Sequence, residues 1–262
     1  MSSDSLALVT GATSGIGLAY AERLAADGHD LIVVGRTKTK LDEFAAAHPH
    51  VEVRVLAADL STPEGIDAVA DAVAAEPLDM LVNNAGVSHY MPLADLPADK
   101  ASEVVNVKVL APTLLMRAAV GGMQRRGQGT IVNVAGMIAF SGPADPSLMP
   151  RRAVYAGTLA HLVAMTQTLA AELDGTGVHA HVVCPGVVAT NFHTVQGLDL
   201  SAVPRMSADD VVTAALAGIA LGETVIAPGV EDPGLLDAVF RADLAAFGGQ
   251  SPKLASRYQG TD

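Results

Sequence analysis

A glycine-rich segment near the start of the chain has the residue types and the spacing of a phosphate-binding loop. It reads Thr10-Gly11-Ala12-Thr13-Ser14-Gly15-Ile16-Gly17 and lies between a short apolar run and a longer segment of helical period. Gly11 permits a tight turn, Gly15 lets backbone approach a phosphate, and Gly17 allows close helix packing. Backbone N–H groups and the helix dipole at such a turn favour a pyrophosphate. The segment therefore predicts a dinucleotide-binding loop.

The end of the next apolar run indicates which dinucleotide would bind. This run ends in Val34-Gly35-Arg36-Thr37. NAD-preferring proteins usually have an acidic residue here, which hydrogen-bonds the ribose 2′-hydroxyl. Gly35 takes that place, and the Arg36 guanidinium can pair with a 2′-phosphate through charge-assisted hydrogen bonds. We therefore expect NADP(H) as the cofactor.

These segments and four others resemble the short-chain dehydrogenase/reductase family. Thr-Gly-x-x-x-Gly-x-Gly differs from the usual dinucleotide spacing and is similar to the signature of that family. The other segments follow in the family's order, between about Ala7 and Gly229, and are Asp59-Leu60, Asn83-Asn84-Ala85-Gly86, Asn106 and Pro185-Gly186-Val187-Val188-Ala189-Thr190. The cofactor-binding residues that the resemblance implies are Gly11, Ser14, Gly15, Ile16, Gly17, Arg36, Asp59, Leu60, Asn83, Ala85, Gly86, Tyr155, Pro185, Gly186, Val188 and Thr190.

The resemblance also implies a catalytic group of Ser, Tyr, Lys and Asn, of which this chain keeps half. In the family, the tyrosine gives a proton to a carbonyl oxygen as hydride arrives from the nicotinamide. A lysine four residues later lowers the pKa of that tyrosine. Tyr155 and Asn106 match the tyrosine and the asparagine, whereas Gly136 stands at the serine position and Leu159 at the lysine position. The candidate catalytic residues are therefore Tyr155 and Asn106.

The missing lysine has a large expected effect on the chemistry of Tyr155. A free tyrosine has a pKa near ~10, so forming tyrosinate at pH 7 costs about 4 kcal/mol. An ammonium about 4 Å away contributes about that much at an effective dielectric of 20. Leu159 cannot supply this charge, so Tyr155 is expected to stay protonated and to act as a hydrogen-bond donor. The loss removes on the order of a hundredfold of acid–base catalysis.

Other side chains could replace the two missing groups, and the sequence leaves the choice open. Ser141 lies close to the family's serine–tyrosine separation, although only a shifted alignment would place it in the site. Arg151 and Arg152 could line the mouth of a pocket. Lys108 is expected on a different helix face from Asn106, because it lies two positions later. Loop residues that could meet a substrate are Ser88, His89, Tyr90 and His193.

The elements that must position these residues alternate between short apolar runs and longer Ala-rich segments of helical period. The predicted strands are Leu6–Thr10, Asp30–Gly35, Val51–Leu56, Leu78–Val82, Thr130–Val134, Val178–Val183 and Thr224–Ala227. The predicted helices are Ile16–Ala26, Leu41–Ala47, Ile66–Ala74, Ala101–Gln124, Val154–Leu173 and Asp209–Leu221. Strands apolar on both faces indicate a parallel sheet covered by helices on both sides. We therefore predict an α/β, Rossmann-type doubly wound sheet of about seven strands, which binds ligands at its carboxyl edge.

Composition limits the remaining possibilities. With 262 residues, 50% of them hydrophobic, and no linker-like segment, the chain is expected to form one domain over residues 1–262 with a substrate loop around 187–207. A net charge of -12 argues against a nucleic-acid partner. No apolar run reaches the ~18 residues of a membrane span, and the single cysteine, Cys184, excludes an internal disulfide and a thiolate metal cluster. We expect a cytoplasmic protein without a metal or a membrane contact and, from the resemblance, a homodimer or homotetramer.

Three functions remain open. The first is an NADP(H)-dependent oxidoreductase that acts on a hydrophobic carbonyl or alcohol compound with a degraded Ser-Tyr-Lys relay. The second is a non-redox catalyst, such as a cyclase, isomerase or dehydratase, that uses Tyr155 as an acid. The third is a cofactor-binding pseudoenzyme or regulatory subunit. A hydrophobic small molecule is favoured as substrate by the apolar residues of the predicted pocket loops, which are Met91, Met137, Phe140, Met149 and Phe192.

Overall fold

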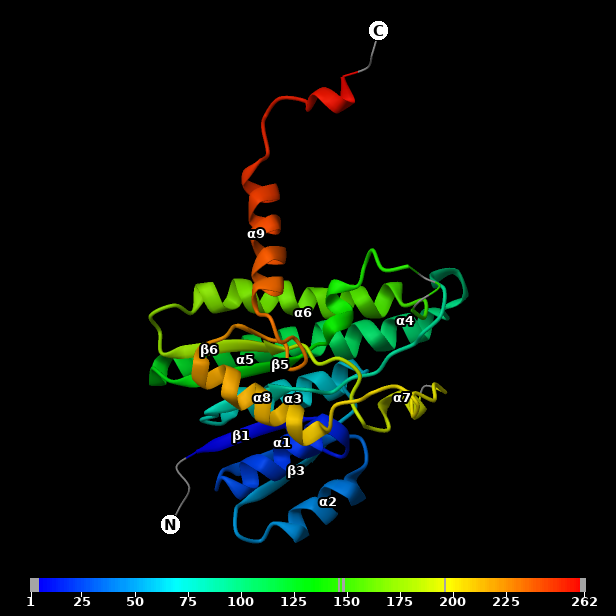
Figure 1. The fold of residues 1–262 in the computed structure, drawn as a ribbon. Helices are drawn as coiled ribbons and strands as arrows, with labels where there is room; N and C mark the ends of the chain where they lie inside the picture. The colour runs from blue at the N-terminus through cyan, green and yellow to red at the C-terminus, as the bar shows by residue number, and fades with distance from the viewer. Residues whose placement is uncertain (1–4, 146, 148, 196, 260–262) are drawn as a thin grey trace. The chain divides into compact units, whose positions relative to one another are not determined.

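Seven parallel strands form one sheet in the order β3-β2-β1-β4-β5-β6-β7 (Figure 1). The computed structural model describes residues 5–145, 147, 149–195 and 197–259. The strands are β1 Leu6–Thr10, β2 Asp30–Gly35, β3 Val53–Ala57, β4 Met80–Asn83, β5 Gly129–Val134, β6 Val178–Val183 and β7 Val225–Ile226. The strand order reverses between β1 and β4, which creates a crevice at their carboxyl ends. The predicted doubly wound sheet is confirmed.

Helices connect the strands and cover the sheet on both faces (Figure 1). The α-helices are α1 Gly15–Ala26, α2 Lys38–Ala47, α3 Pro63–Ala75, α4 Ala98–Val105, α5 Ala111–Arg126, α6 Ala153–Glu172, α7 Phe192–Val195, α8 Ala208–Leu221 and α9 Gly234–Gly248. Shorter helical segments are η1 Leu93–Asp95, η2 Asn106–Leu110, η3 Met137–Phe140 and η4 Ser256–Tyr258. Helix α3 starts three residues earlier than the predicted Ile66, because Thr62 Oγ1 caps it by accepting from Gly65 N at 3.1 Å and Pro63 fits its first turn.

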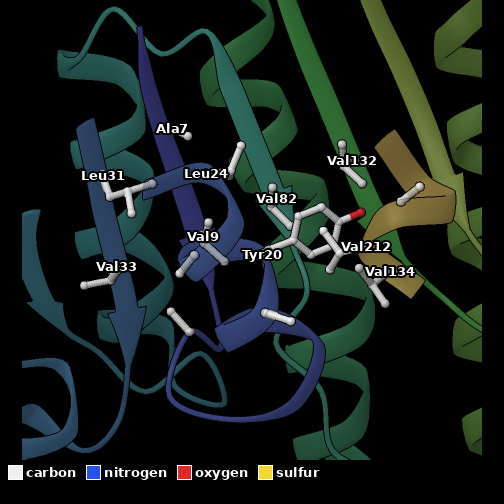
Figure 2. Close-up of a cluster of buried hydrophobic side chains, with 14 of the residues drawn as sticks. Ala7, Val9, Tyr20, Leu24, Leu31, Val33, Val82, Val132, Val134 and Val212 are labelled. Atoms are coloured by element: carbon white, nitrogen blue, oxygen red, sulfur yellow. The ribbon is translucent and has the colours of Figure 1, made fainter. Parts of the chain in front are cut away.

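Two hydrophobic clusters lie on the two faces of the sheet. Alternate residues of β1 enter different clusters: Ala7 and Val9 join residues of α1, α2 and α8, whereas Leu8 joins residues of α3 and α5. Figure 2 shows the first cluster, where the ring of Tyr20 from α1 lies among valines of the strands. This two-sided burial explains why the strand sequences are apolar throughout.

A break in regular helical geometry separates α4 from α5. Residues Asn106–Leu110 form a π-helical segment, and helix continues on both sides over Ala98–Arg126. By length and composition this run could cross a membrane, which differs from the expectation that no apolar run is long enough. However, 44% of its most apolar window is buried inside the protein, where the helices contact α3 and α6.

The chain divides into two compact units, Met1–Pro228 and Gly229–Asp262. The first unit holds the seven strands and every candidate site residue. The second holds α9 and η4, neither of which the sequence analysis predicted.

Candidate active site

A cavity of about 450 Å³ lies along the carboxyl ends of the strands. Its wall is built by the segments that follow β1, β2, β3, β4, β5 and β6, together with residues of α4, the π-helical segment and α6. The predicted cofactor residues on this wall are Gly11, Ser14, Gly15, Ile16, Arg36, Asp59, Leu60, Ala85, Gly86, Tyr155, Pro185, Gly186, Val188 and Thr190. Segments far apart in the sequence therefore meet where a doubly wound sheet binds its ligand.

The glycine loop after β1 has a backbone that only glycine adopts readily. Gly11 has φ +70° and Gly15 has φ +56°, both in the left-handed region. Ser14 precedes α1, and its side chain makes no capping hydrogen bond to the helix. The first N–H groups of a helix have no partner inside it, so this end can bind an anion. The loop therefore fits a pyrophosphate.

Gly17 lies just outside the cavity wall and has a packing role instead. A β-carbon on Gly17 would lie 2.3 Å from Gly11 O and 2.3 Å from Asn84 Nδ2. Any side chain there would push α1 away from the loops that follow β1 and β4.

The segment after β4 also differs from the expectation. Asn83, a predicted cofactor residue, does not line the main cavity; it is buried and its Nδ2 donates to Asn133 Oδ1 at 2.9 Å. Asn84 lies on the wall and ties the loops together, since its Nδ2 donates to Thr10 O at 3.0 Å. Thr10 Oγ1 in turn accepts from Asn84 N at 3.0 Å and Ala85 N at 3.1 Å.

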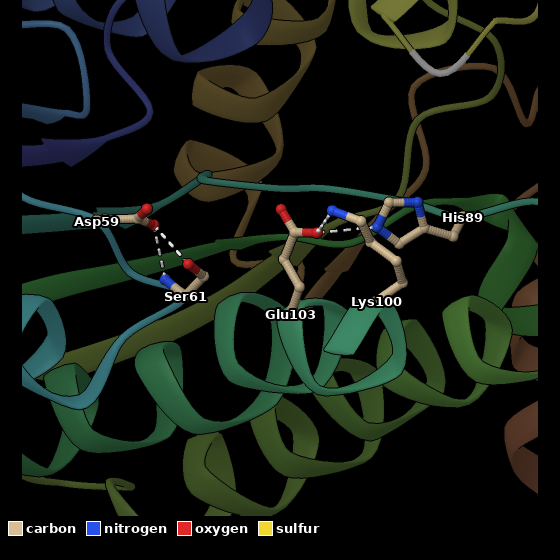
Figure 3. A network of polar contacts seen from close by, with 5 residues as sticks. All are labelled: Asp59, Ser61, His89, Lys100 and Glu103. Carbon is tan, nitrogen blue, oxygen red and sulfur yellow. Dashed lines mark hydrogen bonds and ion pairs between the residues drawn. The ribbon is translucent and has the colours of Figure 1, made fainter. Parts of the chain in front are cut away.

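Asp59, Ser61 and Glu103 line the cavity and take part in the polar contacts that Figure 3 shows. Asp59 Oδ1 accepts from Ser61 N at 2.9 Å and from Ser61 Oγ at 2.8 Å. Glu103, which belongs to none of the sequence motifs, also lines the cavity, and its Oε2 lies 3.0 Å from both Lys100 Nζ and His89 Nε2. Burial alone would raise the pKa of Glu103, but these two partners bring it below its ordinary value.

Arg36 is exposed at the edge of the same cavity. Gly35, beside it, packs against the loop after β1: a β-carbon there would lie 3.0 Å from Thr13 Cγ2. At the end of β2 the wall therefore has the exposed guanidinium of Arg36, and the neighbouring position 35 is a glycine and not an acidic residue.

Tyr155 is buried in the cavity wall, with 7% of its surface exposed. The centroid of its ring lies 5.5 Å from that of Tyr90, which it meets edge-on, and 6.2 Å from that of Phe192. Burial, followed by the nearby Tyr90, raises the pKa of the phenol above its ordinary value. Tyr155 is therefore protonated at neutral pH and can donate a hydrogen bond into the cavity.

Gly136 and Leu159 line the cavity together with Tyr155. A β-carbon on Gly136 would lie 3.5 Å from Pro185 O and 3.6 Å from Leu159 Cδ1, which are ordinary contact distances. The wall thus has room for a small side chain at the position where the family's serine would stand.

Ser141 reaches the wall, but its hydroxyl is already bonded. Ser141 Oγ donates to Ile138 O at 2.7 Å and accepts from Arg152 Nε at 3.1 Å. Arg152 is buried and holds the loop through Ser141 O at 2.7 Å and Pro150 O at 3.0 Å. These contacts give Arg152 a structural role, and they leave Ser141 without a proton to donate to a ligand.

Asn106 and Lys108 lie in the opposite arrangement to the one that we expected. Asn106 Nδ2 donates to Ser61 O at 2.8 Å, and the residue does not line the cavity. Lys108 does line it, with 4% of its surface exposed and its Nζ 3.2 Å from Val134 O. Burial lowers the pKa of Lys108 to about 8. Of these two residues, Lys108 is therefore the one whose side chain lies on the cavity wall.

A glycine loop at the reversal point of a doubly wound sheet, with a phenol on the wall of the same cavity, defines a nicotinamide-dinucleotide protein of the Rossmann type. The short chain dehydrogenase family model matches residues 5–199. This chain belongs to the short-chain dehydrogenase family, whose members are oxidoreductases that act on small molecules with a nicotinamide cofactor.

Individual relatives agree with this assignment. A very-long-chain 3-oxoacyl-CoA reductase-like protein of Arabidopsis thaliana is 30% identical over 225 residues, which cover 83% of this chain and 71% of that protein. A solved short-chain dehydrogenase of Sphingobium yanoikuyae, in complex with NADPH, is 30% identical with a TM-score of 0.91, over 97% of this chain and 100% of that one. A bulky-bulky ketone specific alcohol dehydrogenase of Comamonas testosteroni is 28% identical with a TM-score of 0.87, over 98% and 99% of the two chains.

Proposed function

We propose that this chain is an NADP(H)-dependent oxidoreductase that interconverts a hydrophobic ketone and the corresponding secondary alcohol. The observation that carries the proposal is the position of Tyr155. Its buried phenol lines the same cavity as the glycine loop and Arg36, so a proton donor and a dinucleotide site share one space.

The cavity wall supports a dinucleotide that carries a 2′-phosphate. The uncapped start of α1 and the two left-handed glycines fit its pyrophosphate. Arg36 can pair with the 2′-phosphate. Gly35 stands where an acidic residue would repel this phosphate, so the repulsion does not arise. The Sphingobium relative, described in complex with NADPH, supports the same preference.

The chemistry of a reduction needs one hydride and one proton. A reduced nicotinamide, when bound, would supply the hydride. The Tyr155 hydroxyl donates a hydrogen bond to the carbonyl oxygen of the substrate, which polarises the carbonyl bond, and then releases its proton to that oxygen. Solvent returns a proton to the tyrosine. The Tyr90, Phe192 and Leu159 side chains lie on the same wall and make the surroundings of the phenol apolar.

The wall around Tyr155 supports a substrate with large apolar groups. Its described side chains are mostly aromatic or aliphatic and include Tyr90, Met137, Ile138, Met149, Leu159 and Phe192. Among described wall residues, Asp59 and Glu103 carry carboxylates, and both are held by hydrogen bonds. The Comamonas relative is described as specific for bulky-bulky ketones, and we infer the same substrate class here.

A spectrophotometric assay of NADPH consumption tests this function. The panel should contain a diaryl ketone, acetone and a 2-oxo acid, each with NADPH and with NADH. We expect the diaryl ketone with NADPH to give the highest kcat/KM. The redox proposal would be overturned if NADPH binds but the protein neither reduces these carbonyl compounds nor oxidises the corresponding alcohols. That result would favour a non-redox catalyst or a binding protein.

A further inference from the structure

Lys108 is a buried ammonium whose location no packing argument explains. It is almost fully enclosed on the cavity wall, and among the described residues its recorded hydrogen bond is the one to Val134 O at 3.2 Å. Removing an ammonium from water is unfavourable unless opposite charge compensates for it. A methionine of similar length would fill the same space without that penalty. The charge itself therefore needs an explanation.

The local backbone is shaped to hold this side chain in the cavity. Lys108 is the central residue of the π-helical segment, a type of local irregularity that is frequent at functional sites. The lack of a side chain at Gly86 leaves room for the end of the lysine, since a β-carbon there would lie 2.6 Å from Lys108 Cε and 2.7 Å from Nζ. The ammonium is thus held between the segment after β4 and the end of β5.

The titratable groups that share the cavity wall with this cation leave one phenol as the partner that the chemistry favours. Those on the described cavity wall, besides Arg36, are Asp59, Tyr90, Glu103, Tyr155 and His193. Asp59 accepts from Ser61, and Glu103 lies against Lys100 and His89, so both carboxylates are already engaged. The group whose negative charge would develop during turnover is Tyr155.

We propose that Lys108 supplies the positive charge that Leu159 cannot, by stabilising the oxyanion that forms on Tyr155 when it releases its proton. This inference rests on the proposed function. In a reduction, the O–H bond of Tyr155 breaks as the substrate oxygen takes the proton and the carbonyl carbon takes the hydride. The electron pair of that bond stays on Tyr155 Oη, where the Lys108 ammonium stabilises it until solvent restores the proton. Lys108 thus acts through Tyr155, from a different helix than the family's lysine.

The coupling between the two side chains can be measured without cofactor or substrate. An ordinary buried phenol loses its proton only after Lys108 has become neutral, because burial raises the pKa of Tyr155 and lowers that of Lys108. A tetrafluorinated tyrosine at position 155 has a far more acidic phenol and a fluorine NMR signal of its own. In this labelled protein the phenol can ionise while Lys108 still carries its charge.

We expect Lys108→Met to raise the titration midpoint of the labelled tyrosine by at least about one pH unit, a tenfold change in acid dissociation. Lys108→Arg should keep the low midpoint, since arginine retains the charge. Lys40→Met, which removes an exposed cation away from the cavity, should leave the midpoint unchanged. Identical midpoints in the parent and Lys108→Met would overturn the inference. If Lys108→Met does not fold, Lys108→Gln gives the same test.

Steady-state kinetics separate this inference from the proposed function. We expect Lys108→Met to lower kcat for ketone reduction by about a hundredfold with a much smaller change in KM. Adding Leu159→Lys to that variant should restore part of the loss, because it returns a cation to the tyrosine helix. If the parent protein reduces no ketone but its fluorotyrosine midpoint depends on Lys108, the proposed function fails while the coupling stands. An active parent whose kcat survives Lys108→Met would overturn the coupling alone.

Discussion

The space that a side chain on Gly86 would occupy is filled by the end of Lys108, with Cε 2.6 Å and Nζ 2.7 Å from the position of the missing β-carbon. Gly86→Ala should therefore displace the ammonium from Val134 O. We expect kcat for ketone reduction to fall on the order of tenfold, because small displacements of a charged partner are costly in catalysis. NADPH affinity, measured separately, shows how much of the change comes from cofactor binding.

Gly157→Ala on α6 is the matched control for this change. Apart from the adjacent backbone of its own helix, nothing lies within 4 Å of a β-carbon at Gly157, and the residue is exposed in the second turn of α6. Alanine should raise the free energy of unfolding by up to about 1 kcal/mol and leave kcat unchanged. A Gly86→Ala protein that is as active as the parent would contradict the assigned role of the glycine.

The buried charge of Lys108 predicts how stability depends on pH. Burial lowers the pKa of this group from 10.5 to about 8 in the folded chain. Between these values the unfolded chain binds a proton that the folded chain has lost, so the free energy of unfolding rises with pH across this window. Below pH 8 the full penalty of burying the ammonium remains, and it amounts to roughly 3 kcal/mol.

Lys108→Met removes this penalty. At pH 7 the variant should be more stable than the parent by up to about 3 kcal/mol, and the difference should shrink as the pH rises toward 10. Urea unfolding of both proteins at pH 7 and pH 10 measures this directly. A variant that is less stable than the parent at both pH values would show that Lys108 contributes mainly to packing.

Arg36 is predicted to determine the cofactor preference. Arg36→Asp should weaken NADPH binding by about tenfold to a hundredfold, because a charge-assisted contact to the 2′-phosphate is replaced by repulsion. NADH affinity should be unchanged or higher. Calorimetric titration with both cofactors gives the two affinities, and Lys38→Gln, an exposed cation outside the cavity wall, is the control. Equal affinity of the parent for NADPH and NADH would remove the basis of this prediction.

Tyr155 is predicted to be essential for turnover but not for cofactor binding. Tyr155→Phe should cost more than about 2 kcal/mol of transition-state stabilisation, seen as a fall in kcat of at least about thirtyfold. NADPH affinity should be nearly unchanged. Tyr258→Phe, at an exposed tyrosine outside the cavity wall, should behave like the parent. Full activity of Tyr155→Phe would place the chemistry elsewhere.

The strands and the glycine loop were predictable because their signals are local. Each strand is a short apolar run bounded by turn residues, and burial on both faces makes this pattern visible in sequence alone. The second strand, Asp30–Gly35, has the same bounds in the structure as in the prediction. Helix starts were less accurate, because a cap such as Thr62 acts through one hydrogen bond that apolar periodicity does not reveal.

The positions of Asn106 and Lys108 could not be predicted from helical periodicity. A regular helix rotates by 100° per residue, so choosing Asn106 as the inward residue placed Lys108 on another face. The π-helical segment changes this rotation locally, and it has no clear sequence signal. The two asparagines at the end of β4 raise a similar problem, since only tertiary contacts decide that Asn83 bonds to Asn133 and Asn84 to Thr10 at the end of β1.

The hydrogen bonds of Thr10 have a consequence for the thermodynamics and the order of ligand binding. Its hydroxyl accepts from the backbone of both Asn84 and Ala85, and Asn84 bonds back to the loop after β1. These two loops are fixed when the chain folds, so the entropy of ordering them is not lost again when a ligand arrives. A dinucleotide therefore meets a rigid half-site, and its rate of association should be limited by diffusion and orientation instead of loop closure. Since the bound dinucleotide would itself complete the cavity beside Tyr155, the ketone is expected to bind second.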